Sequence, residues 1–304
     1  MEAAAMAPEG WIFDRAEDLR GWLAAQRASG ATIGFVPTMG ALHAGHGSLV
    51  ARSVAAGHRT VVSIFVNPTQ FTEQADFEGY PVTLAQDLEG LRTWGAAAVF
   101  VPTVDEVYGG EVAVESVHWG PAFGGYEAAD RPGHFDGVVA VLDRLFRVVA
   151  PDAVFMGEKD LQQLAVVRVL AGRRFPGLQV VGCPVVREPD GLAMSSRNRR
   201  LGAEAREQAR ALYRVLRRMG EEVASGEAPT TALERGRRAL GEAPGVRVFY
   251  LDLVQGEDFA PWSPAASGPT YAIVAAEVGG VRLLDNIPLT SPSGGQVGAG
   301  EVTK

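Results

Sequence analysis

The stretch Gly34-Phe-Val-Pro-Thr-Met-Gly-Ala-Leu-His-Ala-Gly-His-Gly-Ser-Leu49 runs from a predicted strand through a glycine-rich loop into a predicted helix. Its glycines let the backbone approach a ligand closely, and the free N–H groups at a helix start attract anions. His43 and His46 add two side-chain donors at the same place. This layout is suited to a nucleotide triphosphate.

Two other interpretations of the histidine pair stay open. Zinc is one, although no thiolate lies nearby and His58, His118 and His134 show no ligand spacing. In the other, both histidines only satisfy hydrogen bonds at a turn. The fingerprints G-x-G-x-x-G and G-x-x-x-x-G-K-[ST] are absent, so nicotinamide and P-loop chemistry are poorly supported.

Outward from this stretch, strand and helix patterns alternate as far as residue 185. The strands are expected at 32–36, 60–66, 97–101, 153–156 and 178–186, and the helices at 46–56, 83–94, 137–149 and 161–171. Such alternation predicts βαβ crossovers and an α/β fold with a doubly wound, mostly parallel, Rossmann-like sheet. Sheets of this kind bind ligands at the carboxyl ends of their strands.

The pattern changes after residue 200. Helices are expected at 203–225 and 230–240, and strands at 246–254, 271–278 and 281–285, the last two joined by a Gly-Gly hairpin signal. We therefore expect a Rossmann-like domain over 1–185, a smaller α+β domain over 186–290, and a disordered tail over 291–304.

Composition excludes several classes of protein. The chain has 304 residues, 47% of them apolar, and its longest apolar runs are six residues long, far short of the ~18 of a membrane span. The net charge of −8, without a dense basic run, disfavours nucleic-acid and anionic-membrane partners. The N-terminus lacks the basic and apolar regions of a secretory signal, so a cytoplasmic protein is expected.

Two residue types are scarce enough to be informative. Cys183 is the single cysteine, which rules out an intramolecular disulfide. Of the 28 basic residues, all but Lys159 and Lys304 are arginine. A lysine retained inside such a chain indicates a need for a compact ammonium on a flexible stem, although chance explains it equally simply.

Two further strand ends carry polar side chains. Asn67 and Gln70 follow the buried run 61–66, where neutral amides could hydrogen-bond substrate hydroxyls or a carboxylate. Lys159 follows the run 153–156, where its ammonium could face a phosphate; Asp160 could accept from a ribose hydroxyl, and Gln163 lies one turn further along the helix. For the first strand end the alternative is an Asn-Pro turn without a ligand role. For the second it is a solvated helix start.

The segment Met194-Ser-Ser-Arg-Asn198 lies between the two expected domains. Its hydroxyls and guanidinium could wrap phosphate oxygens through several hydrogen bonds and close over a bound triphosphate. A polar linker is the simpler alternative.

Together these segments closely resemble the pantoate–β-alanine ligase family, a branch of the nucleotidyltransferase superfamily that also holds the class I aminoacyl-tRNA synthetases. The resemblance covers about residues 11–290. Pro37–His46 is similar to the family's His-x-Gly-His region, and Met194–Asn198 to its counterpart of the synthetases' Lys-Met-Ser-Lys-Ser loop. Further segments match in order: 63–68 with 70–71, 131–135, 157–160 with 162–163, and 284–286.

The resemblance implies an ATP-dependent ligase with Mg²⁺ as cofactor, in which the domain over 1–185 binds ATP and pantoate and the domain over 186–290 is a lid. Pantoate would attack the α-phosphorus of Mg-ATP to give pantoyl adenylate and pyrophosphate, and the β-alanine amine would then displace AMP to give pantothenate. Because the nucleophile is already an anion, positioning and charge stabilisation should dominate the first step. The family also suggests a homodimer whose partners are small molecules.

The resemblance also implies residue roles. The triphosphate and its developing charge would be held by His43, His46, Lys159, Ser195, Ser196 and Arg197. Other ATP contacts would come from Pro37, Met39 (near the reacting groups), Gly157 and Asp160 (ribose), Val186 (adenine) and Met194. Pantoate would contact Gln70 and Gln163, the pocket wall would include Asn67, Tyr80 and Glu127, and Asp87 would be associated with Mg²⁺.

Two positions depart from the family pattern. Thr69 stands where the family usually has Met, and Val82 where it usually has Arg. The missing arginine puts in doubt any salt bridge that the family forms there.

Three other functions stay open. A nucleotidylyltransferase would use the same phosphate grip and stop at a nucleotidyl product. A tRNA-charging enzyme is disfavoured because only about 100 residues follow the serine segment and the net charge is negative, which leaves little surface to bind RNA. A nucleotide-binding regulatory module would keep the fold without turnover.

Overall fold

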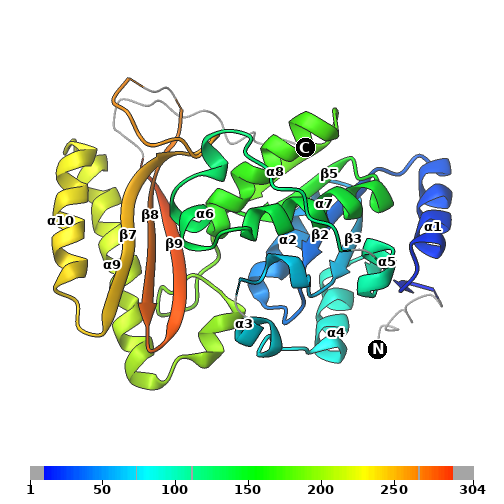
Figure 1. Ribbon diagram of the computed structural model, residues 1–304, viewed down its shortest axis with the longest axis horizontal. Coiled ribbons are helices and arrows are strands. Elements are labelled where there is room, and N and C mark those ends of the chain that lie inside the picture. The colour runs from blue at the N-terminus through cyan, green and yellow to red at the C-terminus, as the bar shows by residue number, and fades with distance from the viewer. Residues whose placement is uncertain (1–9, 73, 111, 266–267, 290–304) are drawn as a thin grey trace, which may run out of the picture. The chain divides into compact units, whose positions relative to one another are not determined.

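A computed structural model of the chain describes residues 10–72, 74–110, 112–265 and 268–289 (Figure 1). The chain forms two compact units. The first comprises Met1–Val186 with Met194–Ser196, and the second comprises Arg187–Ala193 with Arg197–Lys304. The expected tail at 291–304 lies outside the described residues.

The first unit contains a six-stranded sheet in the order β1-β4-β3-β2-β5-β6, with every pair parallel. Its strands are β1 (Ile12–Phe13), β2 (Ile33–Thr38), β3 (Arg59–Ile64), β4 (Ala98–Phe100), β5 (Ala153–Gly157) and β6 (Gln179–Cys183). From β2 the chain builds towards β4 on one side, then crosses over to β5 and β6 on the other. The crossing point therefore lies between β2 and β5.

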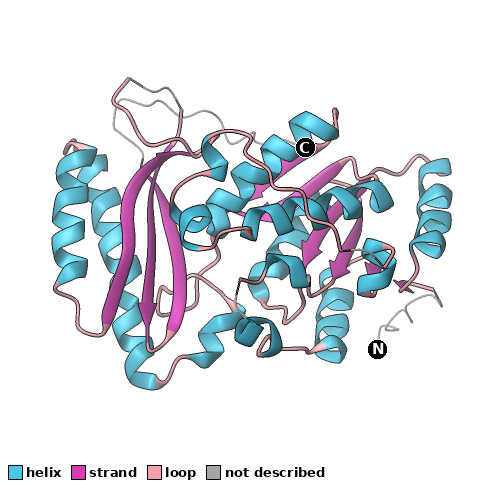
Figure 2. Ribbon diagram, viewed as in Figure 1, coloured by secondary structure: helices cyan, strands magenta, loops and turns pink. Residues whose placement is uncertain are grey.

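Helices cover both faces of this sheet (Figure 2). They are α1 (Ala16–Ala28), α2 (Ala44–Ala55), α3 (Gln74–Glu78), α4 (Leu84–Trp94), α5 (Val104–Tyr108), α6 (Tyr126–Asp130), α7 (His134–Val149) and α8 (Leu161–Arg174). On β2, Val36 packs in the cluster that holds Leu91 of α4. Phe35, the residue before Val36, packs against Phe146 of α7, and the centres of the two rings lie 6.2 Å apart. Burial on both faces explains why the strands read as continuous apolar runs.

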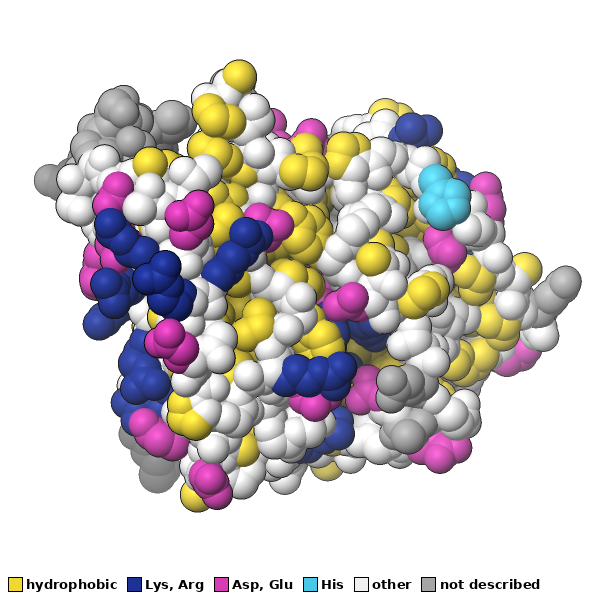
Figure 3. All heavy atoms as spheres, turned by 60° about the vertical axis from the view of Figure 1, so that its left-hand side comes forward, with side chains coloured by type: hydrophobic (Ala, Val, Ile, Leu, Met, Phe, Trp, Pro, Cys, Tyr) yellow, Lys and Arg dark blue, Asp and Glu magenta, His cyan; other side chains and the backbone are white. Residues whose placement is uncertain are grey.

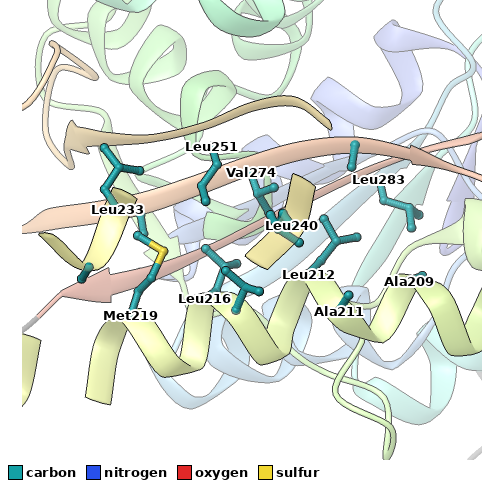
Figure 4. Close-up of a cluster of buried hydrophobic side chains, with 14 of the residues drawn as sticks. Ala209, Ala211, Leu212, Leu216, Met219, Leu233, Leu240, Leu251, Val274 and Leu283 are labelled. Atoms are coloured by element: carbon teal, nitrogen blue, oxygen red, sulfur yellow. The ribbon is translucent and has the colours of Figure 1, made fainter. Parts of the chain in front are cut away.

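The second unit packs two helices on an antiparallel sheet. Its elements are α9 (Ala203–Ala224), α10 (Pro229–Gly241), β7 (Val246–Gln255), β8 (Thr270–Val278) and β9 (Val281–Leu289), with strand order β7-β8-β9. Figure 4 shows the core, in which Leu212, Leu216 and Met219 of α9 meet strand side chains. Gly279 and Gly280 both have positive φ (57° and 75°), as the expected hairpin turn requires.

Charges on the helices of the second unit are paired locally. On α9, Arg218 Nε lies 2.8 Å from Glu222 Oε1, and Arg217 Nε lies 3.4 Å from Glu221 Oε1. On the face drawn in Figure 3, basic side chains lie among acidic ones. Exposed pairs of this kind contribute little to stability, and they leave no uninterrupted basic field on that face.

The expected α/β fold is confirmed, and the differences are missed elements and shifted element ends. The expectations missed β1, α1 and the short helices α3, α5 and α6, and they placed the end of β6 at residue 186. The strand ends at Cys183, which pairs with Gly157, the last residue of β5, and the next residue, Pro184, has no N–H to continue the ladder. β9 is also an edge strand, and it continues past Pro288, which pairs with Tyr271 of β8, to Leu289. Among the described residues, no helix has the length and apolarity to cross a membrane.

Candidate active site

Three loops that carry the predicted site residues leave the carboxyl ends of neighbouring strands in the first unit. They follow β2 (39–43), β3 (67–70) and β5 (158–160), and the first and third flank the crossing point of the sheet. Loops that diverge at such a point leave a crevice where ligands bind. Local sequence therefore supplies the side chains, and the strand order brings them together.

A buried carboxylate holds the loop after β2. Asp87, on α4 and only 3% exposed, accepts hydrogen bonds from Ala41 N (2.9 Å) and Leu42 N (2.8 Å). Its Oδ1 also accepts from Thr83 Oγ1 at 3.0 Å. Ala41 has a φ of 49°, in the left-handed region that costs energy for a residue with a Cβ. Charge-assisted bonds to this strained turn fix the loop that presents the histidines.

The histidine pair caps helix α2. His43 Nδ1 accepts from Gly45 N at 3.2 Å, and His46 Nδ1 accepts from His43 N at 3.3 Å. Because both Nδ1 atoms are acceptors, each ring in its neutral form carries its proton on Nε2. The turn interpretation and the ligand interpretation are therefore compatible. One nitrogen of each ring stabilises the helix start, and the other is an N–H donor.

Charged side chains of both signs act on the pair. Burial, followed by the neighbouring imidazole of His43, lowers the pKa of His46 from 6.5 to about 3; Asp160 opposes this shift, and Lys159 adds a smaller lowering. Both residues belong to η3 (Glu158–Asp160). Lys159 Nζ lies 3.3 Å from Asp160 Oδ1. His46 is therefore neutral at pH 7, with this ion pair acting on it.

The serine segment meets the same loop. Met194–Ser196 belongs to the first unit, where Ser196 Oγ donates to Ala41 O at 2.9 Å and Met194 N donates to Val186 O at 2.9 Å. These bonds bring Ser196 to the strained turn after β2. Arg197 belongs to the second unit, so its membership of the site stays a prediction.

The side chains of the loop after β3 are held by neutral groups, and its backbone also accepts from one cation, Arg131. Asn67, only 1% exposed, donates from Nδ2 to Gln70 Oε1 at 3.0 Å. Gln70 Nε2 in turn lies 3.1 Å from Met39 Sδ of the neighbouring loop. The carbonyl of Gln70 accepts from Arg131 Nη2 (3.3 Å) and lies 2.7 Å from His134 Nδ1. The predicted pantoate residue Gln70 is thus fixed at both its backbone and its side chain.

The remaining predicted residues occupy α8 and the segments around it. Gln163 is half-buried on α8, and Glu127 is buried on α6. The ring of Tyr80 packs edge-on against Phe71 at 5.7 Å. Pro37 and Gly157 are half-buried near the ends of β2 and β5. Their ligand roles stay predictions.

Sequence reasoning missed several residues that support the site. Gln162 accepts from Glu127 N at 3.0 Å and donates to the carbonyls of Ala122 and Gly124, both at 3.1 Å, so it ties the segment before α6 to α8. Arg131 and His134 lie in a stretch quoted for the family resemblance without a role. Tyr108, described below, carried no signal in the sequence, and Thr69 was noticed only as a departure from the family pattern.

A protein-held metal is not supported by the described residues. No group of three His, Cys, Asp or Glu side chains among them is arranged to hold an ion. Both oxygens of Asp87 already accept hydrogen bonds inside the protein. The predicted association of Asp87 with Mg²⁺ therefore does not fit direct coordination.

Comparisons with known proteins agree with the architecture and with the residues. The profile of the family described as pantoate-beta-alanine ligase matches residues 11–288. A pantothenate synthetase of Bacteroides thetaiotaomicron is 43% identical over 274 residues, which cover 89% of this chain and 96% of the relative. One of Cereibacter sphaeroides is 45% identical over 272 residues, which cover 90% and 97%.

Solved structures agree as well. A pantothenate synthetase of Thermus thermophilus has a TM-score of 0.85 and 40% identity, covering 91% of this chain and 99% of that one. A pantoate-beta-alanine ligase of Francisella tularensis, complexed with beta-gamma ATP and beta-alanine, has a TM-score of 0.75 and 30% identity, covering 93% and 99%. With a family profile spanning nearly the whole described fold, the chain belongs to the pantoate–β-alanine ligase family.

Proposed function

We propose that this enzyme condenses pantoate with β-alanine to form pantothenate, using ATP. The observation that carries the proposal is the meeting of two kinds of loop at one edge of the sheet. The loops after β2 and β5 supply imidazole N–H donors and an ammonium, and the loop after β3 supplies a neutral amide pocket. A polyphosphate suits the first, and a hydroxy acid suits the second.

The first step of the proposed reaction transfers AMP to pantoate. A pantoate carboxylate oxygen bonds to the α-phosphorus while the bond from that phosphorus to the bridging oxygen breaks, and pyrophosphate leaves with the electron pair. Lys159 would stabilise the charge on the phosphate oxygens, and the Nε2–H groups of His43 and His46 would donate to them. No base is needed because the carboxylate is ionised.

The second step forms the amide. The neutral amine of β-alanine attacks the acyl carbonyl of the adenylate, the C–N bond forms, the C–O bond to phosphate breaks, AMP leaves with the electron pair, and the nitrogen releases one proton to the solution. The chain's part in this step is to keep the adenylate in place and exclude water, which would otherwise hydrolyse it. The Francisella relative, whose complex holds beta-alanine together with beta-gamma ATP, supports the pairing of these ligands.

Magnesium enters this proposal as part of the Mg-ATP substrate. Asp87 does not fit a direct ligand, so we assign the ion no protein carboxylate and derive no step through it. A homodimer in the cytoplasm, as the family resemblance suggests, is part of the proposal, and light scattering on the purified protein tests the dimer.

The central experiment incubates the protein with ATP, Mg²⁺ and pantoate, with and without β-alanine. Pantothenate, AMP and pyrophosphate are measured by mass spectrometry. Pantoate labelled with ¹⁸O in its carboxylate should pass one label to AMP, because the labelled oxygen stays on phosphorus when the amide forms. Pantothenate without label in AMP would contradict the adenylate route.

Two other outcomes separate the competing functions. AMP formation that is indifferent to β-alanine would favour a nucleotidylyltransferase. ATP binding without pyrophosphate release under any mixture of substrates would favour a nucleotide-binding module without turnover.

A further inference from the structure

The hydroxyl of Thr69 lies in a polar cluster beneath the predicted pantoate pocket. Thr69 Oγ1 lies 3.0 Å from Asn67 Oδ1 and 3.1 Å from Tyr108 Oη. Tyr108 Oη donates to the same Asn67 Oδ1 at 2.7 Å. Tyr108 is on α5, so the cluster joins the end of β3 to a helix about 40 residues further along the chain.

This cluster fixes the orientation of the Asn67 amide. On one side, Oδ1 faces Thr69 N, which can only donate, together with the two hydroxyls. On the other side, Nδ2 faces Gly137 O at 3.2 Å, which can only accept. Rotating the amide by 180° would set donor against donor and acceptor against acceptor. Asn67 therefore has one favourable orientation.

The orientation of Asn67 in turn sets that of Gln70. Because Asn67 Nδ2 donates to Gln70 Oε1, the oxygen of Gln70 is occupied and its Nε2 is directed elsewhere. That nitrogen meets Met39 Sδ at 3.1 Å. A thioether is a weak acceptor, so an oxygen supplied by a ligand would readily take its place.

We propose that Thr69 and Tyr108 are positioning residues that orient Gln70 as a hydrogen-bond donor to an acceptor oxygen of the hydroxy-acid substrate. The inference rests on the proposed function and deepens it by specifying which end of the amide meets pantoate. Neither hydroxyl needs to touch the substrate. Both act through Asn67.

The packing around the cluster restricts its movement. A Cβ built on Gly137 would lie 2.2 Å from Thr69 O, so α7 lies directly against the loop. The guanidinium of Arg144 lies 4.6 Å from the centre of the Tyr108 ring, whose other neighbour is Phe65. Burial raises the pKa of Tyr108, so its hydroxyl keeps the proton that it donates.

The test compares Thr69→Val, which keeps the shape of the side chain and removes the hydroxyl, with Thr69→Ser, which keeps the hydroxyl. For Thr69→Val we expect the KM for pantoate to rise about five- to tenfold, the scale of one lost hydrogen bond, and the KM for ATP to stay within about twofold. Thr69→Ser should stay close to wild type. Tyr108→Phe should act like Thr69→Val, because it keeps the ring and its packing.

Thr60→Val is the matched control. Thr60 is fully buried in β3 and donates to Ser53 Oγ at 2.8 Å, at the opposite end of the strand from the site. This variant should lower the melting temperature without changing the ratio of the two KM values. A selective rise in the pantoate KM for Thr60→Val would show that any loss of a buried hydroxyl produces the effect, and would overturn the proposal.

A double-variant cycle tests whether Thr69 acts through Gln70. In a Gln70→Ala background, Thr69→Val should cause no further loss of pantoate affinity, measured by titration calorimetry. A further loss as large as in the wild-type background, or variants of Thr69 and Tyr108 that bind pantoate normally, would overturn the proposal. Absence of pantothenate formation by the wild-type enzyme would instead contradict the proposed function, and calorimetry with pantoate would still test the positioning.

Discussion

The loops after β2 and β3 leave adjacent strands, yet they are held by opposite means. Two backbone amides of the first loop, at Ala41 and Leu42, bind the ionised oxygens of a buried carboxylate. In the second loop, neutral amides and hydroxyls bind one another over the start of α7. The first arrangement places a negative charge beneath the loop, and the second places none.

This difference matches what each loop is proposed to bind. The loop after β2 carries His43, and it presents the imidazole pair beside Lys159, the ammonium that is proposed to meet the phosphates of ATP. The side chain of Gln70 is oriented by the neutral amide of Asn67, so we expect it to discriminate by the direction of its hydrogen bond. Each loop can therefore be altered separately, and the affinities for ATP and for pantoate should show which loop was changed.

The largest effect is expected from removing Lys159, the cation that is proposed to bind the phosphates of ATP. Lys159→Ala should lower the rate of pantoate adenylation by about 10²–10³, the scale for removing one preorganised charge-stabilising group. Pyrophosphate release in single turnovers measures this rate. A properly folded variant that releases pyrophosphate at a near wild-type rate would refute the role of Lys159.

Gly137→Ala would disturb the loop after β3, which is proposed to bind pantoate, from the side of α7. The added Cβ would meet the backbone oxygen of Thr69 at 2.2 Å, so α7 or the loop must move. We expect a loss of about 3 kcal/mol in the free energy of unfolding, together with weaker pantoate binding. Urea unfolding and calorimetry measure the two effects. Gly172→Ala is the control, since it lies in α8 with open space around it; unchanged stability in Gly137→Ala would contradict the close packing.

Asp87→Asn would disturb the loop after β2, which is proposed to bind ATP. The substitution removes the charge and sets an amide NH₂ against donors, so we expect about 2 kcal/mol less stability and a larger loss of affinity for ATP than for pantoate. Chemical denaturation and two calorimetric titrations measure this. Equal losses for both ligands would show that the two loops are not held independently.

The smallest effect concerns His46. Because the folded protein lowers its pKa from 6.5 to about 3, the unfolded chain takes up a proton between these pH values and the native state does not. Stability should therefore fall as the pH falls below 6.5, by about 1 kcal/mol from this residue at pH 5.5. His46→Asn should have a shallower pH dependence of urea unfolding than wild type. Identical slopes would contradict the shift.

Periodicity predicted most of the fold, and it failed where local signals are weak. The parallel strands and the Gly-Gly hairpin were evident as apolar runs and turn residues. Helix α1 was not, because its sequence includes Gly21 and its first turn has no side-chain cap. The start of α2 was placed two residues late because a histidine, Ala44's neighbour His43, provides the cap that Ser, Thr or Asp usually provides.

The residues of the candidate site also fall into those that the sequence could predict and those that it could not. Residues that follow strands, such as Gln70 and Lys159, could be selected because parallel strands end at one edge. The partners of Asp87 could not be predicted, since an acid in the first turn of a helix gives no sign that it accepts from the amides of Ala41 and Leu42, 46 and 45 residues earlier. Glycine was ambiguous too: Gly47 was attributed to ligand approach, yet a Cβ there would meet the ring of Trp94 at 2.7 Å.

The path of the chain between the two units has a consequence for synthesis. The polypeptide leaves the first unit after Val186, returns for Met194–Ser196, and leaves it again. A nascent chain released from the ribosome up to Val186 would hold the whole parallel sheet but lack the serine hydroxyl that bonds Ala41 O. The first unit is therefore incomplete until its last three residues have emerged, and a single cut after Val186 would not release all of it.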